Sequence, residues 1–157
     1  MSRAQVSVIV TLWIVLAGCA PGPDLLIHPN PAPTATQPAC LPSPTQPATG
    51  GFREVRATMR SSGEVWALLF FDQARAGDDE KIVWRISGSG QPDFQAQNQD
   101  GVVIRPDWGP ALHESSTWDR PGQEWGTGFI FPEGGCWTIT VTHGATVGEI
   151  KLRVLAP

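Results

Sequence analysis

The sequence lacks the short motifs that mark the commonest metal and hydrolase sites. Its three histidines and three cysteines show no H-x-x-x-H or C-x-x-C spacing, so no zinc site is expected. The acidic run Asp78-Asp79-Glu80 lacks the alternating ligands and the glycine of a calcium loop, and we interpret it as a solvated turn. No serine lies in a G-x-S-x-G turn. We therefore expect neither a bound metal nor a cofactor.

Two further arrangements would suit a hydrolase. Ser115 and Ser116 lie close to His113, and Asp119 and Glu124 flank a Pro-Gly turn across which two carboxylates could face each other. Serines beside turns and acidic pairs in loops are commonplace, however. The sequence therefore predicts that the protein is not an enzyme.

Positive charge is scarce and dispersed. The chain has 11 Lys and Arg against 15 Asp and Glu, a net charge of −4, and no block of like charge. Proteins that bind nucleic acid or anionic lipid do so through clustered basic residues. Neither partner is expected, and the charged residues read as an ordinary solvated surface.

The N-terminal apolar run, Val6 to Leu16, is too short to span a bilayer but suits the core of a signal peptide. It ends in Leu16-Ala17-Gly18-Cys19, which looks like a lipobox. We predict a signal peptide over residues 1–18, and diacylglycerol and palmitate on Cys19 that hold the protein on the extracytoplasmic side of the cell membrane. The alternatives are an uncleaved membrane anchor and a buried first strand, because the run is rich in β-branched residues.

Cysteine is rare as well. With Cys19 lipidated, only Cys40 and Cys136 remain, in a compartment that permits disulfides. A bond between them would close a loop of about 100 residues and would contribute roughly 4 to 5 kcal/mol in the chain-entropy model. The alternative is a pair of free thiols.

Residues 19–51 differ in composition from the rest of the chain. Nine of the 15 prolines lie between Pro21 and Gly51, among Thr, Ala, Gln and Ser and without Lys or Arg. Such a segment buries too little apolar surface to fold, and it predicts a disordered tether with about 3 Å per residue where it is polyproline II. Residues 52–157 suit one β-domain. If Cys40 bonds Cys136, residues 41–51 would lie along that domain.

Hydrophobicity in residues 52–157 alternates with the period of a β-strand. The clearest runs are Lys81–Ile86, Cys136–Thr142 and Glu149–Val154, and less regular ones are Val55–Met59, Glu64–Phe71, Val102–Arg105 and Thr127–Phe131. Glycine-rich turns separate these runs. About seven short strands predict an all-β fold, an antiparallel two-sheet sandwich of immunoglobulin-like type.

The segment Pro106 to Pro132 carries three tryptophans among Gly, Pro, Ser and Asp, which predicts a long loop. One interpretation is a ligand-binding platform in which the indoles stack on sugar rings and nearby acids supply hydrogen bonds. The candidate residues are Trp108, Trp118 and Trp125 with Asp107, Asp119 and Glu124. The alternative, which we favour, is an aromatic plug that folds over one end of the sandwich and buries its own tryptophans.

The run Gly128-Phe129-Ile130-Phe131-Pro132-Glu133-Gly134-Gly135-Cys136-Trp137 resembles a recurring element, G-[FL]-x-F-P-x-x-G-C-W, of uncharacterised bacterial secreted proteins and lipoproteins. The resemblance covers Cys40 and residues 80–155, without a clear match over 88–112. It implies an immunoglobulin-like sandwich and a bond from Cys40 to Cys136. It implies no catalytic or binding residue.

The same motif predicts local structure. Pro132 to Gly135 should form a turn between two strands, with Cys136 at a strand start and Trp137 pointing into the core.

Taken together, these features predict a lipid-anchored cell-envelope protein with a non-enzymatic binding domain. Its expected partners are the membrane, through Cys19, and either another envelope protein or a glycan. A carbohydrate-binding module that uses the tryptophan segment is the alternative, and an envelope hydrolase is a third.

Overall fold

The computed structural model describes residues 39–114 and 116–157. The predicted signal peptide over residues 1–18, the lipidation site Cys19 and the tether up to residue 38 lie outside the described residues. No helix in the described part of the chain is long and apolar enough to cross a membrane. The described residues belong to one compact unit, Gln37–Pro157, which has its own hydrophobic core and disulfide.

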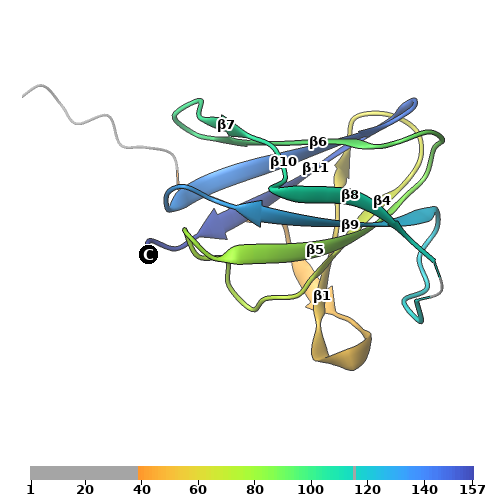
Figure 1. The fold of residues 1–157 in the computed structure, drawn as a ribbon, viewed down its shortest axis with the longest axis horizontal. Coiled ribbons are helices and arrows are strands. Elements are labelled where there is room, and N and C mark those ends of the chain that lie inside the picture. The colour runs from red at the N-terminus through yellow and green to blue at the C-terminus, as the bar shows by residue number, and fades with distance from the viewer. Residues whose placement is uncertain (1–38, 115) are drawn as a thin grey trace, which may run out of the picture. The chain divides into compact units, whose positions relative to one another are not determined.

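Two antiparallel sheets form the fold, and the predicted all-β two-sheet sandwich is confirmed (Figure 1). Sheet A has the order β1-β2-β4-β5-β9-β8, and sheet B has the order β3-β11-β10-β6-β7. The strands of sheet A are β1 (Thr45–Pro47), β2 (Arg53–Arg56), β4 (Val65–Leu69), β5 (Asp79–Ile86), β8 (Trp108–His113) and β9 (Gln123–Ile130). Those of sheet B are β3 (Thr58–Met59), β6 (Asp93–Asn98), β7 (Val103–Ile104), β10 (Gly135–His143) and β11 (Thr146–Val154). A short 3-10 helix, η1 (Thr49–Gly51), links β1 to β2.

The described residues form eleven strands, whereas about seven were predicted. The run predicted as one strand over Val55–Met59 divides at Ala57 into β2 and β3, which belong to different sheets. Strand β6 was missed because Phe94 and Ala96 are its only buried apolar residues and its other positions are Asp, Gln and Asn. Strand β1 lies within the segment predicted as tether and pairs with β2.

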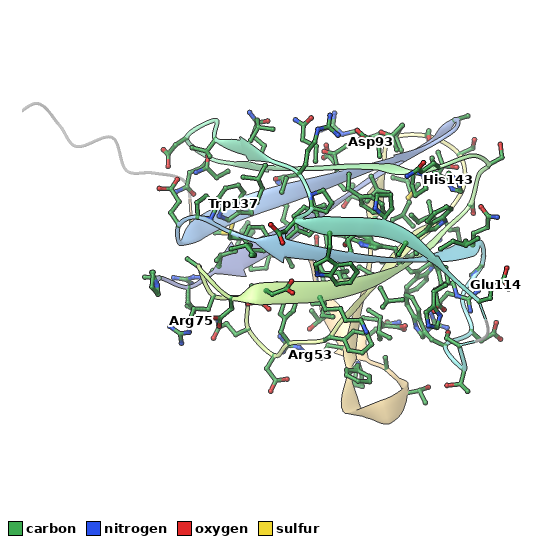
Figure 2. The ribbon with its side chains drawn as sticks, viewed as in Figure 1. Arg53, Arg75, Asp93, Glu114, Trp137 and His143 are labelled. Atoms are coloured by element: carbon green, nitrogen blue, oxygen red, sulfur yellow. A yellow bond between two sulfur atoms is a disulfide. The ribbon has the colours of Figure 1, made fainter. Side chains whose placement is uncertain are left out.

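The two strands with the cleanest alternation in the sequence form the centre of sheet B. Strands β10 and β11 pair along their whole length, and Ile150, Leu152 and Val154 are buried as predicted. Trp137 is fully buried and donates its indole N–H to the Glu133 carbonyl at 3.1 Å. Figure 2 shows Trp137 and His143 toward opposite ends of β10. The predicted turn before Cys136 and the inward orientation of Trp137 are therefore confirmed.

The predicted disulfide is confirmed. Cys40 and Cys136 are bonded, with their Cα atoms 5.3 Å apart. The following segment is held against β11, where the Ser43 amide donates to the Lys151 carbonyl at 2.9 Å. Residues 40–47 thus run from the outer face of sheet B to the edge of sheet A.

Candidate functional site

The tryptophan segment is not the single long loop that its composition predicted. Residues 108–113 form β8 and residues 123–130 form β9, which pair with each other, and only the stretch between them is irregular. Gly126 and Gly128 lie within β9, and Pro110 lies within the edge strand β8. Glycine and proline are depleted in strands, which is why this part was mistaken for a loop.

The three tryptophans of this segment have separate environments. Trp125 is 8 % exposed and belongs to the core between the sheets, where its ring and the His143 ring form a T-shaped pair with centroids 6.0 Å apart. Trp118 is 5 % exposed and packs on Leu68 and Val83. Buried indoles cannot stack on an external ligand, so the three do not form a shared exposed platform. The burial of Trp118 agrees with the predicted aromatic plug. The loop that carries it covers a face of sheet A, however, and not an end of the sandwich.

Trp108 lies flat over two glycines of β9. A Cβ added at Gly128 would lie 1.9 Å from the indole nitrogen, and one at Gly126 would lie 3.5 Å from the far ring carbon Cζ3. The indole therefore spans both positions and covers the bare backbone of the strand. Its N–H points to the carboxylate of Asp79, at 3.1 and 3.2 Å from the two oxygens.

The outer face of sheet A, which points away from the sandwich core, carries a second apolar cluster. Cross-strand register places Leu68, Val83, Gly126 and Ala111 side by side on β4, β5, β9 and β8. Leu68 and Val83 are buried beneath Trp118, with Phe52 and Trp66 packed at the margin. An exposed face of an antiparallel sheet is ordinarily polar, so this face is unusual.

A buried carboxylate on β2 fastens the loop that carries Trp118. Glu54 is fully buried; it accepts hydrogen bonds from the Trp118 indole at 2.7 Å and from the Gln46 amide at 2.6 Å, and it pairs with Arg120. The Arg120 guanidinium also lies 4.6 Å above the Trp66 ring. Burial alone would raise the pKa of Glu54, but the three hydrogen bonds and the positive charge of Arg120 lower it below its ordinary value.

A second buried carboxylate, Glu124 on β9, fastens the beginning of the same loop. Glu124 is 4 % exposed, and its oxygens lie 3.0 Å from Nε of Arg85 and 2.8 Å from Nδ1 of His113. The Ser116 hydroxyl donates to the same carboxylate and accepts a hydrogen bond from the Trp118 amide. The loop between β8 and β9 is thus held at both ends by negative charges that the sheet buries.

Between this loop and the sheet lies a groove of about 360 Å³. Leu68, Val83 and Gly126 form its floor. The apolar residues of the walls and rim are Phe52, Phe70, Trp108, Ala111, Leu112 and Trp118. The polar and charged lining residues are Thr49, Lys81, His113, Ser116, Thr117 and Glu124. Phe70 is 38 % exposed and Leu112 is 52 % exposed. Apolar concavities of about 300 to 1,000 Å³ with a few polar groups are typical of small-molecule sites.

Of the six residues predicted to bind a ligand, the structure brings Trp108, Trp118 and Glu124 together in this groove. Trp125 faces the opposite side of the sheet, and Asp107 and Asp119 are exposed and do not line the groove. Most of the aromatic and charged residues around the groove were missed. Arg85, Arg120 and Glu54 come from distant parts of the chain, and only strand register brings them to the loop.

The arrangements that would suit a hydrolase take a different form in the structure. The Ser116 hydroxyl is bonded to Glu124, as is Nδ1 of His113, so Glu124 accepts from both side chains. Asp119 is exposed whereas Glu124 is buried. Ser115 lies outside the described residues.

Sheet B has a larger hollow of about 480 Å³ on its outer face, but its lining is mainly polar. Gln95, Gln97, Thr138 and Thr140 form its floor, and Glu149 is bonded to both Arg60 and Thr140. This is the ordinary solvated face of an antiparallel sheet. Within residues 39–114 and 116–157 no group of three or more His, Cys, Asp or Glu side chains is placed to hold a metal ion.

Comparison with known proteins gives no relative. No protein-family model, no curated protein and no solved structure matches the chain. The resemblance to bacterial proteins with the G-[FL]-x-F-P-x-x-G-C-W element stays a prediction.

Proposed function

We propose that the protein is a cell-envelope binding protein, anchored by lipid on Cys19, whose β-sandwich is a non-catalytic module with its ligand site in the groove on the outer face of sheet A. The observation that carries this proposal is the apolar floor of the groove, on a sheet face that would otherwise be solvated. The loop over this face is fixed by Glu54 and Glu124, so one wall of the site is formed before a ligand binds.

A neutral apolar dye, N-phenyl-1-naphthylamine, tests whether the groove is a binding site. The oxidised domain, residues 37–157, should bind the dye with enhanced fluorescence. Gly126→Val should weaken binding, because a Cβ at this floor position meets only ordinary van der Waals contacts and the added methyls enter the groove. Thr138→Val is the matched control on the face of sheet B. Equal binding by both variants and the parent domain would refute the site.

The anchor is tested on the full-length chain in a bacterial host. Labelled palmitate should be incorporated into the parent chain and not into Cys19→Ser, which should leave the membrane fraction. Cys136→Ser controls for a general effect of cysteine loss, since the lipid is expected on Cys19 alone. Membrane retention of the Cys19→Ser chain would refute anchoring by lipid.

One observation favours glycan binding as a second candidate function. The Trp108 indole lies flat on β9, and it is half-buried, so part of the ring remains accessible beside the groove. Flat accessible indoles can stack on the apolar face of a sugar ring. The domain should then be retained on insoluble peptidoglycan or another polysaccharide, and Trp108→Ala should lose this retention while keeping its thermal stability within a few degrees. Equal retention of both proteins would exclude Trp108 as the contact.

A further inference from the structure

The groove contains a lysine, Lys81, that has an aromatic contact but no carboxylate partner among the described residues. Lys81 lies on β5 in a row with Phe70, which follows β4, and with Gly128 on β9. Its ammonium lies 4.2 Å from the centroid of the Phe70 ring. No carboxylate of the described residues lies within ion-pair distance of it, and the nearby Asp79 accepts the Trp108 indole N–H instead.

The other charged groups of the groove neutralise one another. Glu124 pairs with Arg85 and with Nδ1 of His113, so it offers no free negative charge to a ligand. Next to Lys81, the floor of Leu68 and Val83 is apolar, and the partly exposed Phe70 ring lies beside it. The site therefore combines an apolar trough with a cation beside it.

We propose that the groove takes an amphiphilic carboxylate, an acyl chain of moderate length whose chain lies along Leu68, Val83 and Phe70 and whose carboxylate accepts hydrogen bonds from Lys81. This inference rests on the proposed function, namely that the groove is the ligand site. The charge complementarity follows from Lys81, and the apolar body follows from the floor. A volume of about 360 Å³ lies within the range of small-ligand sites. Charge-assisted hydrogen bonds are about twice as strong as neutral ones, so the headgroup should govern selectivity.

Displacement of the naphthylamine dye by a series of ligands with one tail and different headgroups tests the proposal. Dodecanoate, dodecyl maltoside and dodecyltrimethylammonium are compared below their micellar concentrations on the oxidised domain, with near-ultraviolet circular dichroism to show that it stays folded. Acetate serves as a headgroup without a tail. Dodecanoate should displace the dye at a concentration at least about tenfold lower than the other two dodecyl compounds, and acetate should not displace it.

Lys81→Met keeps much of the apolar stem but removes the charge, and it should abolish the preference for dodecanoate when displacement is referred to the dye affinity of the variant itself. Lys151→Met, an exposed lysine on sheet B, is the matched control and should keep the preference. Equal displacement by all three headgroups, or a preference that survives Lys81→Met, would overturn the inference. Displacement by soluble glycan fragments but not by dodecanoate would overturn it and leave the groove as a site. Failure of the dye to bind, or binding unchanged by Gly126→Val, would instead refute the proposed function.

Discussion

Replacing Glu54 with glutamine should lower the stability of the domain, by an amount that depends on pH. Glu54 is fully buried, and the side chain of its partner Arg120 is 33 % exposed. Breaking a buried ion pair costs about 3 to 5 kcal/mol, and we expect about 3 kcal/mol at pH 7 because Arg120 can still reach water. The carboxylate of Glu54 has a lowered pKa in the folded state, so its contribution is present above the unfolded pKa of about 4.3 and is lost as the pH falls through the lower folded value.

Denaturant unfolding of the oxidised domain at pH 7 and in steps down to about pH 3 measures this effect. The free-energy difference between the parent domain and Glu54→Gln should be largest at neutral pH and should shrink at acid pH. Glu64→Gln is the control, because Glu64 and its partner Arg56 are both solvent-accessible and such pairs are worth about 0 to 1 kcal/mol. A stability difference that stays constant down to the lowest pH would refute the assignment of charge to Glu54. No difference at pH 7 would refute a stabilising role for the contacts of Glu54 with Arg120 and Trp118.

Four other substitutions test separate parts of the structure. Glu80→Gln should have the opposite pH dependence: burial raises the pKa of Glu80, so the variant should gain stability relative to the parent as the pH rises through that raised value, as measured by denaturant unfolding. Trp137→Ala should cost about 3 to 5 kcal/mol, and a thermal melt with almost no shift would contradict its burial. Gly128→Ala should cost about 1 to 3 kcal/mol and change tryptophan fluorescence, since the added methyl collides with the indole nitrogen above it; an unchanged spectrum would contradict this packing. Cys136→Ser should lower the free energy of unfolding by about 4 kcal/mol, because the disulfide joins residues 96 apart, and equal stability of the variant would show that the bond adds nothing.

The parts of the fold that the sequence predicts well are those in which local pattern and tertiary burial agree. Strands β10 and β11 alternate apolar and polar residues over 137–142 and 149–154, and their register follows from this alternation. The disulfide was predictable because only two cysteines remain beyond the proposed lipidation site. In these cases few competing arrangements exist, so a single sequence is enough.

The groove could not be predicted, because its residues become neighbours only through pairing between distant strands. Glu54 and Trp118 are 64 residues apart, and Arg85 and Glu124 meet only because β5 pairs with β9. The glycines of β9 give a misleading local signal as well. Glycine in a sequence favours a loop over a strand. In the fold, however, the absence of a side chain at Gly128 leaves the space that the Trp108 indole occupies.

The placement of proline and of short strands adds a reason to regard the groove as the surface for association. Both sheets have open edges: β1 and β8 border sheet A, and β3 and β7 border sheet B. Pro47 lies in β1 and Pro110 in β8, while β3 and β7 are only two residues long. Proline and short length both discourage the addition of another strand. With its edges protected in this way, the domain leaves the partly covered apolar face of sheet A, where the proposed ligand site lies, as a surface on which association does not require an added strand.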